Sequence, residues 1–140
     1  MFGGVVTDLD QWTLNLLTNP TVLAINAHGT TLNKPVPLMA GSSSSCYAWQ
    51  AQATSNDSAS SHPRAFVAIF NTDNANDVDT CRVDFKDVSV VRKGTTKCTT
   101  TDVWAASRTA GKLMTKSGDG EISARVRSTD VALLELTECV

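Results

Sequence analysis

From Pro35 onward the chain alternates short runs of strand-forming residues with clusters of turn-forming residues, and this pattern restricts the fold to a β-sheet protein. The candidate strands are residues 46–53, 64–71, 82–85, 99–104, 122–127 and 131–137. The segments 41–45, 54–62, 71–79 and 117–120, together with the Ser128-Thr129-Asp130 turn, are rich in Gly, Ser, Asn and Asp. Short strands at such spacing are typical of an antiparallel sandwich or barrel. We predict an all-β antiparallel β-sandwich of Greek-key type with seven or eight strands.

Two of these runs carry further information. Residues 46–53 alternate with a period of two, and one face, which includes Tyr47 and Trp49, is apolar. Residues 64–71 are apolar almost throughout, which is typical of a central strand buried on both sides.

The first 27 residues follow a different pattern. An apolar run with a glycine pair precedes one amphipathic helix, which Thr7 or Asp8 caps and Asn19-Pro20 ends. The apolar positions Leu9, Trp12 and Leu16 fall on one face of that helix, and Leu17 flanks it. A chain of 140 residues, 41% hydrophobic, buries one sizeable core. We therefore predict one domain at 28–140, preceded by a strand-and-helix appendage at 1–27.

Ordered blocks of the chain resemble the C-terminal region of α-galactosidases of glycoside hydrolase family 27, the melibiase type. The blocks are Met1-Phe-Gly-Gly, Leu9-Asp10, Trp12-Thr-Leu-Asn-Leu-Leu-Thr-Asn19, Val22-Leu-Ala-Ile-Asn26, Ala48-Trp49, Phe66-Val-Ala-Ile-Phe-Asn71, Cys81-Arg-Val-Asp-Phe85, Thr101-Asp-Val-Trp104, Ile122-Ser-Ala-Arg-Val126 and Val131-Ala-Leu-Leu-Glu-Leu-Thr137. The resemblance implies that 1–27 is the remnant of the last strand and helix of a (β/α)8 barrel, and that 28–140 is the C-terminal β-domain attached to it.

In the resembled family, two aspartates on loops after earlier barrel strands hydrolyse the glycosidic bond with retention. Those strands are absent from this sequence, so we assign no catalytic residue, cofactor or metal. The retained turn also departs from the family pattern, because Val5-Val6-Thr7 stands where relatives carry Asp-Leu-Arg, and Ala27-His28 follows Asn26 where a glutamine is usual. The function predicted is a non-catalytic, supporting C-terminal domain of an α-galactosidase-like glycoside hydrolase. The alternative is a free-standing carbohydrate-binding or adhesion domain.

The four cysteines, Cys46, Cys81, Cys98 and Cys139, stand singly without a Cys-x-x-Cys pair, which argues against a zinc or redox site. Disulfides are favoured over four buried thiols, with Cys81 joined to Cys98 and Cys46 joined to Cys139. Asn56-Asp-Ser is a glycosylation sequon in a polar loop. Both features are typical of a secreted or lysosomal protein.

Charge and the remaining polar clusters exclude several classes of function. The 12 basic and 14 acidic residues are scattered, so neither nucleic acid nor a membrane surface is expected as partner. An acidic loop, Asp73-Asn74 and Asn76-Asp77 with Asp79, lacks the glycine and glutamate of a calcium loop and is expected to be a solvated connection. His28 and His62 are far apart in sequence, so neither a metal site nor a catalytic triad is expected from them. Asp102, two residues before Trp104, is expected to accept a turn or edge hydrogen bond.

Aromatic side chains are the candidates for stacking on a galactoside. Trp12, Tyr47, Trp49 and Trp104 qualify, but aromatics total only 6% and the last two are expected to pack in the core. The N-terminal apolar patch comprises Phe2, Val5, Val6, Trp12, Leu16 and Leu17. We expect it to fold onto the β-domain or to bury against a second copy, unless a barrel domain of the same or a separate chain covers it.

Overall fold

The computed structural model describes residues 9–28, 30–53, 64–75, 77–91, 93–104, 115–118 and 120–140. These residues form two antiparallel sheets, one of five strands in the order β1-β2-β3-β8-β5 and one of three in the order β4-β7-β6. The strands are β1 Thr30–Val36, β2 Cys46–Ala53, β3 Ala65–Asn71, β4 Val78–Asp84, β5 Thr99–Asp102, β6 Thr115–Gly118, β7 Glu121–Arg127 and β8 Val131–Thr137. The chain passes from one sheet to the other after β3, β4, β5 and β7, and the predicted antiparallel β-sandwich is confirmed.

Within residues 9–28, two helices precede the sandwich, where the sequence predicts one. α1 spans Gln11–Leu17 and α2 spans Pro20–His28. Asn19-Pro20 ends the first helix as predicted but also begins the second, because proline is favoured in a first helical turn and Asn19 Oδ1 accepts the N–H groups of Thr21 and Val22 at 3.0 and 3.2 Å. The cap of α1 is Asp10, whereas the predicted caps Thr7 and Asp8, like the predicted first strand, lie outside the described residues.

The six predicted strands are present, with one end shifted by a single residue at β3 and β7 and with larger shifts at β4 and β5. Two strands, β1 and β6, were not predicted. Most residues of β1 are exposed, so the strand has no inside-outside alternation to reveal it. Its pairing with β2 is also interrupted between Thr31 and Lys34, where Leu32 adopts a positive φ of 56°.

The core lies between the two sheets. Val67 and Ile69 of β3 and Leu134 of β8 face Val83 of β4 and Ile122 of β7, and all five side chains are fully buried. In β2 the buried residues are Cys46, Ala48 and Gln50. The more apolar face of β2, which carries Tyr47 and Trp49, therefore points outward, although its apolarity would suggest that it is buried.

The disulfides are confirmed but the predicted pairing is wrong. Cys46 of β2 is joined to Cys81 of β4, with Cα atoms 5.9 Å apart, and Cys98 is joined to Cys139, with Cα atoms 4.1 Å apart. Cys46 and Cys81 both point into the core from opposite sheets, so they meet there. Cys98 and Cys139 flank the paired strands β5 and β8 at the sheet edge, away from Cys81.

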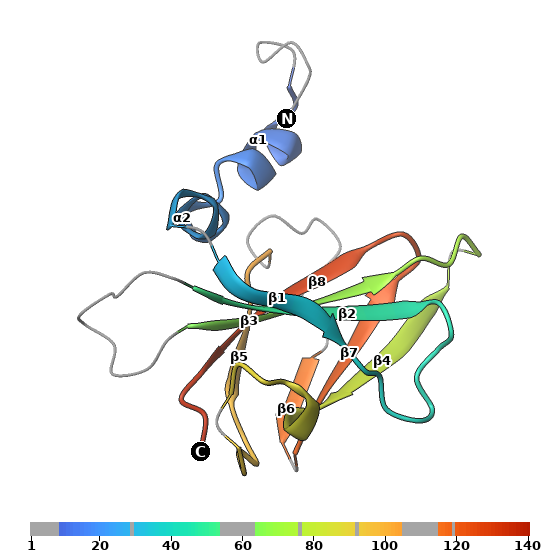
Figure 1. Ribbon diagram of the computed structural model, residues 1–140. Helices are drawn as coiled ribbons and strands as arrows, with labels where there is room; N and C mark the ends of the chain where they lie inside the picture. Colours follow the sequence, from blue (N-terminus) through green and yellow to red (C-terminus); the bar gives the residue numbers. More distant parts are fainter. Residues whose placement is uncertain are drawn as a thin grey trace.

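The helices lie beside one end of the sandwich, next to the start of β1 (Figure 1). Asn19 Nδ2 donates a 2.8 Å hydrogen bond to the carbonyl of Val103, immediately after β5. Because β5 and β1 are the two edge strands of the five-stranded sheet, α2 crosses from one edge of that sheet to the other between Asn19 and Thr30.

Candidate functional site

The outer face of the five-stranded sheet carries three exposed aromatic side chains. Tyr47, Trp49 and Phe70 are 55%, 48% and 38% exposed. Tyr47 is directly opposite Phe70, which is opposite Val131 on β8. We give the name aromatic face to a group of residues on this side of the sheet, namely Pro35, Tyr47, Trp49, Ala68, Phe70, Val131 and Leu133.

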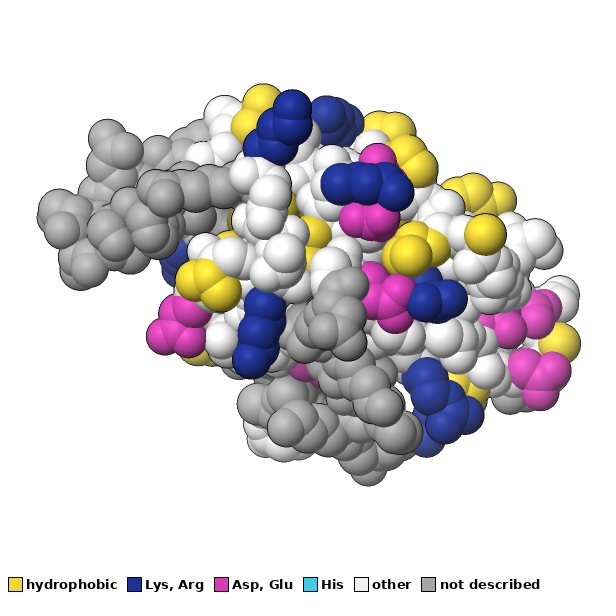
Figure 2. Space-filling model, turned by 90° about the horizontal axis from the view of Figure 1, so that it is seen from below, with side chains coloured by type: hydrophobic (Ala, Val, Ile, Leu, Met, Phe, Trp, Pro, Cys, Tyr) yellow, Lys and Arg dark blue, Asp and Glu magenta, His cyan; other side chains and the backbone are white. Residues whose placement is uncertain are grey.

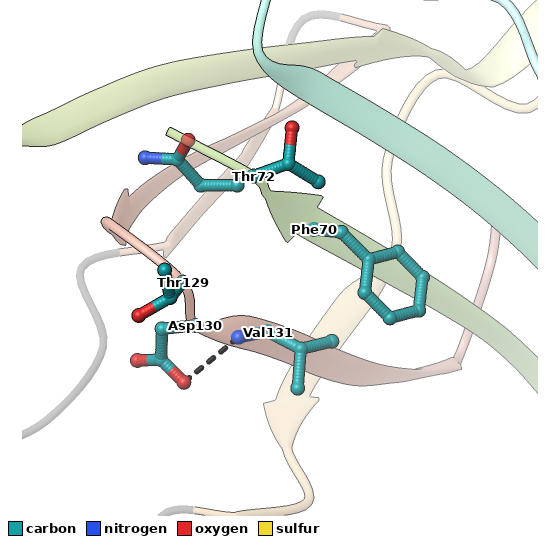
Figure 3. A pocket seen from close by; sticks show the side chains of 6 residues that line it. Phe70, Thr72, Thr129, Asp130 and Val131 are labelled. Carbon is teal, nitrogen blue, oxygen red and sulfur yellow. Dashed lines mark hydrogen bonds between the residues drawn. The ribbon is translucent and has the colours of Figure 1, made fainter. Parts of the chain in front are cut away.

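An open hollow of about 380 Å³ lies where β3 ends and β8 begins. Its lining residues are Phe70, Asn71, Thr72, Thr129, Asp130 and Val131 (Figure 3). The hydrocarbon side chains of Phe70 and Val131 extend side by side, whereas the side chains of Thr129 and Asp130 lie on the other side of the β8 backbone. The apolar wall of the hollow and its rim of oxygen atoms therefore lie on opposite sides of the β8 backbone.

Hydrogen bonds hold this rim in place. Asp130 Oδ1 accepts the N–H of Val131 at 2.7 Å, and the carbonyl of Asp130 accepts the N–H of Asn71 at 3.1 Å. Thr72 Oγ1 donates to the carbonyl of Ser45 at 3.0 Å, which leaves its lone pairs as acceptors. Thr129 has a φ of 55°, an unusual conformation for a β-branched residue.

Two of the aromatic candidates named from the sequence, Tyr47 and Trp49, lie on the aromatic face, whereas Phe70 was not among the candidates. Trp49 was expected in the core and is instead exposed, whereas Trp104 is partly buried. Phe70 was not singled out, because the continuous apolar run of β3 suggested burial on both faces, and Thr129 and Asp130 were named only as part of a turn. The available signal was local: Phe70 is followed by the polar pair Asn71-Thr72.

The N-terminal apolar patch does not fold onto the sandwich where it is described. Trp12 is 47% exposed and α1 contains no buried residue, so that expectation is wrong for this helix. Burial against a second copy stays a prediction. Phe2, Val5 and Val6 lie outside the described residues, as do the sequon residue Asn56 and His62.

The carboxylates serve local structure. Asp102 accepts the N–H of Trp104 at 3.0 Å, which confirms its predicted role as a turn acceptor. In the acidic loop, Asp73 accepts the N–H of Ala75 at 3.2 Å and Asp79 accepts the hydroxyl of Ser45 at 2.8 Å. Within the described ranges, no group of three or more His, Cys, Asp or Glu side chains is placed to hold a metal ion.

A different surface forms the underside of the molecule, where Lys and Arg side chains mix with Asp and Glu and the hydrophobic side chains are scattered (Figure 2). Arg82 pairs with Glu121 across β4 and β7, and Lys86 Nζ lies 2.7 Å from Asp84 Oδ2. The hydrogen bond from the Lys86 side chain lowers the pKa of Asp84, and the same bond raises the pKa of Lys86.

In the part of the chain that the structure describes, neither helix has the length and apolarity to span a membrane.

Comparison with known families gives one match. A model of the alpha galactosidase C-terminal beta sandwich domain matches residues 45–136, which run from the residue before β2 to the penultimate residue of β8. The match covers more than half of the chain and all strands except β1. No curated protein matches the chain significantly.

Proposed function

The chain belongs to the family of α-galactosidase C-terminal β-sandwich domains, and on that premise we propose that it is the non-catalytic, supporting domain of an α-galactosidase-like glycoside hydrolase of family 27. In this proposal a (β/α)8 barrel supplies the two catalytic aspartates and the sandwich stabilises the barrel. The secretory or lysosomal route fits the two disulfides, which persist in oxidising compartments.

The observation that carries the proposal is the unpartnered apolar surface of the two helices. Trp12 and Leu17 of α1 and Leu23 of α2 are 47%, 38% and 49% exposed. Large apolar side chains grouped on one short segment mark a contact surface. The match begins only at residue 45, so these helices precede the sandwich domain as the last helical part of a barrel would.

The hydrogen bond from Asn19 to Val103 supports the same arrangement. Asn19 is 7% exposed, and its side chain both caps α2 and binds the edge of the five-stranded sheet. A barrel that continues from α1 would therefore be held against the sandwich at a defined position. The supporting role follows from this attachment, because the sandwich buries part of the segment that closes the barrel.

Two measurements test the proposal. The purified 140-residue chain should not hydrolyse an aryl α-galactoside, and hydrolysis that disappears on mutation of its own acidic residues would contradict the proposal. In addition, the chain should bind a separately produced family 27 barrel that lacks its last helix. Trp12→Ala and Leu23→Ala should weaken that binding about tenfold or more, as interface anchors do.

The matched control for binding is Val78→Ala. Val78 is 42% exposed but lies on β4, in the other sheet. Its substitution should leave the affinity for the barrel unchanged. Equal losses from Val78→Ala and Trp12→Ala would show that the helices are not the contact surface.

A further inference from the structure

We propose that the Cys98–Cys139 disulfide is a reducible latch on the edge strand β5, and that its reduction releases α1 and α2 from the sandwich. The latch acts at a distance, because the disulfide and the attachment of the helices lie at opposite ends of β5. This property is separate from support of a barrel and does not depend on the proposed function.

The two disulfides differ in how easily a reductant reaches them. Cys46 and Cys81 are 3% and 0% exposed and lie in the core between the sheets. Cys98 is also buried, but its partner Cys139 is only partly buried, at the margin of the core. Access controls the rate of thiol–disulfide exchange, and exposed disulfides are the labile ones. A thiol in solution therefore reaches the edge disulfide before the one in the core.

Reduction by a dithiol takes two steps. In the first, the thiolate of the reductant forms a mixed disulfide with Cys139 Sγ, the Cys98–Cys139 bond breaks, and Cys98 leaves as a thiolate that takes up a proton. In the second, the other thiol of the reductant displaces Cys139 from the mixed disulfide, and the reductant leaves as a cyclic disulfide. Two electrons and two protons have then passed from the dithiol to the protein.

The disulfide secures the end at which β5 begins. This strand is only four residues long, Thr99–Asp102, and pairs with β8 from the edge of the sheet. Just before it, the N–H groups of Thr96 and Lys97 donate to the carbonyl of Val140 at 2.8 and 3.1 Å. A short edge segment held by a few backbone hydrogen bonds opens readily by local unfolding. The covalent link limits this opening, so its loss should make the opening more frequent.

The other end of β5 holds the helices. Val103 follows the strand directly; its N–H donates to the carbonyl of Leu133 and its carbonyl accepts Asn19 Nδ2, both at 2.8 Å. Val103 and Asn19 are 8% and 7% exposed, so this hydrogen bond is largely shielded from water. The helices and the C-terminus lie toward opposite ends of β5 (Figure 1). An opening that starts at Cys98 and runs along the strand therefore removes the acceptor of Asn19.

The rest of the sandwich does not depend on the latch. β8 pairs on its other side with β3, from Ala65 to Phe70, so the five-stranded sheet keeps its remaining strands when β5 opens. Cys46–Cys81 continues to join the two sheets. The change is thus confined to the sheet edge and the helices.

The test compares the 140-residue chain before and after treatment with dithiothreitol without denaturant. In a portion that is alkylated and digested, mass spectrometry should find the label on Cys98 and Cys139, with Cys46 and Cys81 still joined. In NMR spectra of the reduced, unalkylated protein, the side-chain amide signals of Asn19 should shift as their hydrogen bond is lost. Backbone exchange should become about tenfold faster or more at β5 and residues 138–140, and faster by a smaller factor at α2. Reoxidation should reverse both changes.

Variants separate the latch from a general loss of stability. Cys98→Ala with Cys139→Ala should show the Asn19 and α2 changes without reductant, and dithiothreitol should add nothing to them. Asn19→Asp removes the donor to Val103 and leaves the disulfide intact, so its exchange at α2 should be equal with and without dithiothreitol. Val78→Ala, on β4 in the other sheet, is the matched control and should respond to dithiothreitol as the unsubstituted chain does.

Four results would overturn the proposal. The first is a Cys98–Cys139 bond that resists dithiothreitol in the folded protein, and the second is reduction of Cys46–Cys81 before it or together with it. The third is an Asn19 side-chain signal that stays in place once the edge disulfide is reduced. The fourth is an equal gain of α2 exchange on reduction in Asn19→Asp and in the unsubstituted chain, because the effect would then bypass the bond to Val103.

Discussion

At the scale of single residues, the interior of the sandwich accepts a polar side chain where that side chain finds its own partners. Gln50 is 2% exposed, its Oε1 accepts the N–H of Ser89 at 2.8 Å, and its Nε2 donates to the hydroxyl of the same residue. A buried amide without such partners would be costly. These bonds satisfy the amide of Gln50 on the inward face of β2, while Trp49 lies on the outward face.

We predict that Gln50→Ala lowers the free energy of unfolding by about 2–4 kcal/mol, because it leaves a cavity and deprives the Ser89 N–H of its acceptor. Ser89→Ala removes only the hydroxyl and should cost about 1 kcal/mol. Urea denaturation of both variants measures the difference. A larger loss for Ser89→Ala would contradict the proposed role of Gln50.

At the scale of elements, the attachment of the helices depends on one side chain with two functions. Asn19 caps α2 through its oxygen and binds Val103 through its nitrogen. The two functions can be separated chemically, because a carboxylate keeps the acceptor and has no donor. The helices and the sandwich are thus joined by a bond that substitution can remove selectively.

Asn19→Asp should release α2 from the sheet edge but keep its first turn helical. Asn19→Ala should release α2 and also fray its first turn. Hydrogen exchange at α2 should therefore be faster in both variants, with the larger change in Asn19→Ala. Exchange at β3 and β8 serves as the internal control and should not change. Unaltered exchange at α2 in Asn19→Asp would mean that the bond to Val103 does not hold the helix.

The cap of α1 should make that helix sensitive to acid. Asp10 Oδ1 accepts the N–H of Thr13 at 2.7 Å, and this backbone hydrogen bond lowers the pKa of Asp10 from its ordinary value of 3.8. Since the pKa is lower in the folded state, the stabilisation is complete above pH 3.8 and is lost as the pH falls through the folded-state pKa.

Chemical shifts of α1, followed from pH 7 to pH 2, should report this loss of helix. An asparagine side chain caps a helix without titrating, so Asp10→Asn should remove the pH dependence and retain the helix. An identical acid transition in Asp10→Asn would assign the sensitivity to another group.

At the scale of the whole molecule, the two disulfides hold different parts of the fold. Cys46–Cys81 joins the two sheets through the core, whereas Cys98–Cys139 fixes the C-terminus, whose last residue Val140 exchanges backbone hydrogen bonds with Lys97 at 2.9 and 3.1 Å. The linked cysteines are 35 and 41 residues apart in sequence. Loops of such similar length give similar entropic stabilisation.

Both double variants, Cys46→Ala with Cys81→Ala and Cys98→Ala with Cys139→Ala, should therefore lower the free energy of unfolding by roughly 2–4 kcal/mol. Hydrogen exchange should distinguish them. Loss of the inter-sheet bond should expose amides in both sheets, and loss of the edge bond should expose mainly β5 and residues 138–140. The same pattern in both variants would contradict this division.

Local patterns in the sequence were sufficient for the class of fold. Alternation predicts β2, a continuous apolar run predicts β3, and a turn between two runs predicts β7 and β8, while the resemblance predicts the family that the match confirms. The bounds of β8 agree with the prediction because buried and partly buried residues alternate along its whole length. The exposed strand β1 has no such signal, so it could not be predicted.

What only the tertiary structure decided concerns contacts between distant segments. Hydrophobicity alone would predict that Tyr47 and Trp49 face inward, but in the structure the inward face of β2 carries Gln50, bonded to Ser89, and Cys46, bonded to Cys81. The hollow depends likewise on β3 meeting β8. The period of the apolar residues and the turn-forming residues are properties of neighbouring positions and can be read along the chain. The buried face of β2, the disulfide partners and the position of the hollow depend on which distant strands pair, and local sequence patterns do not contain that information.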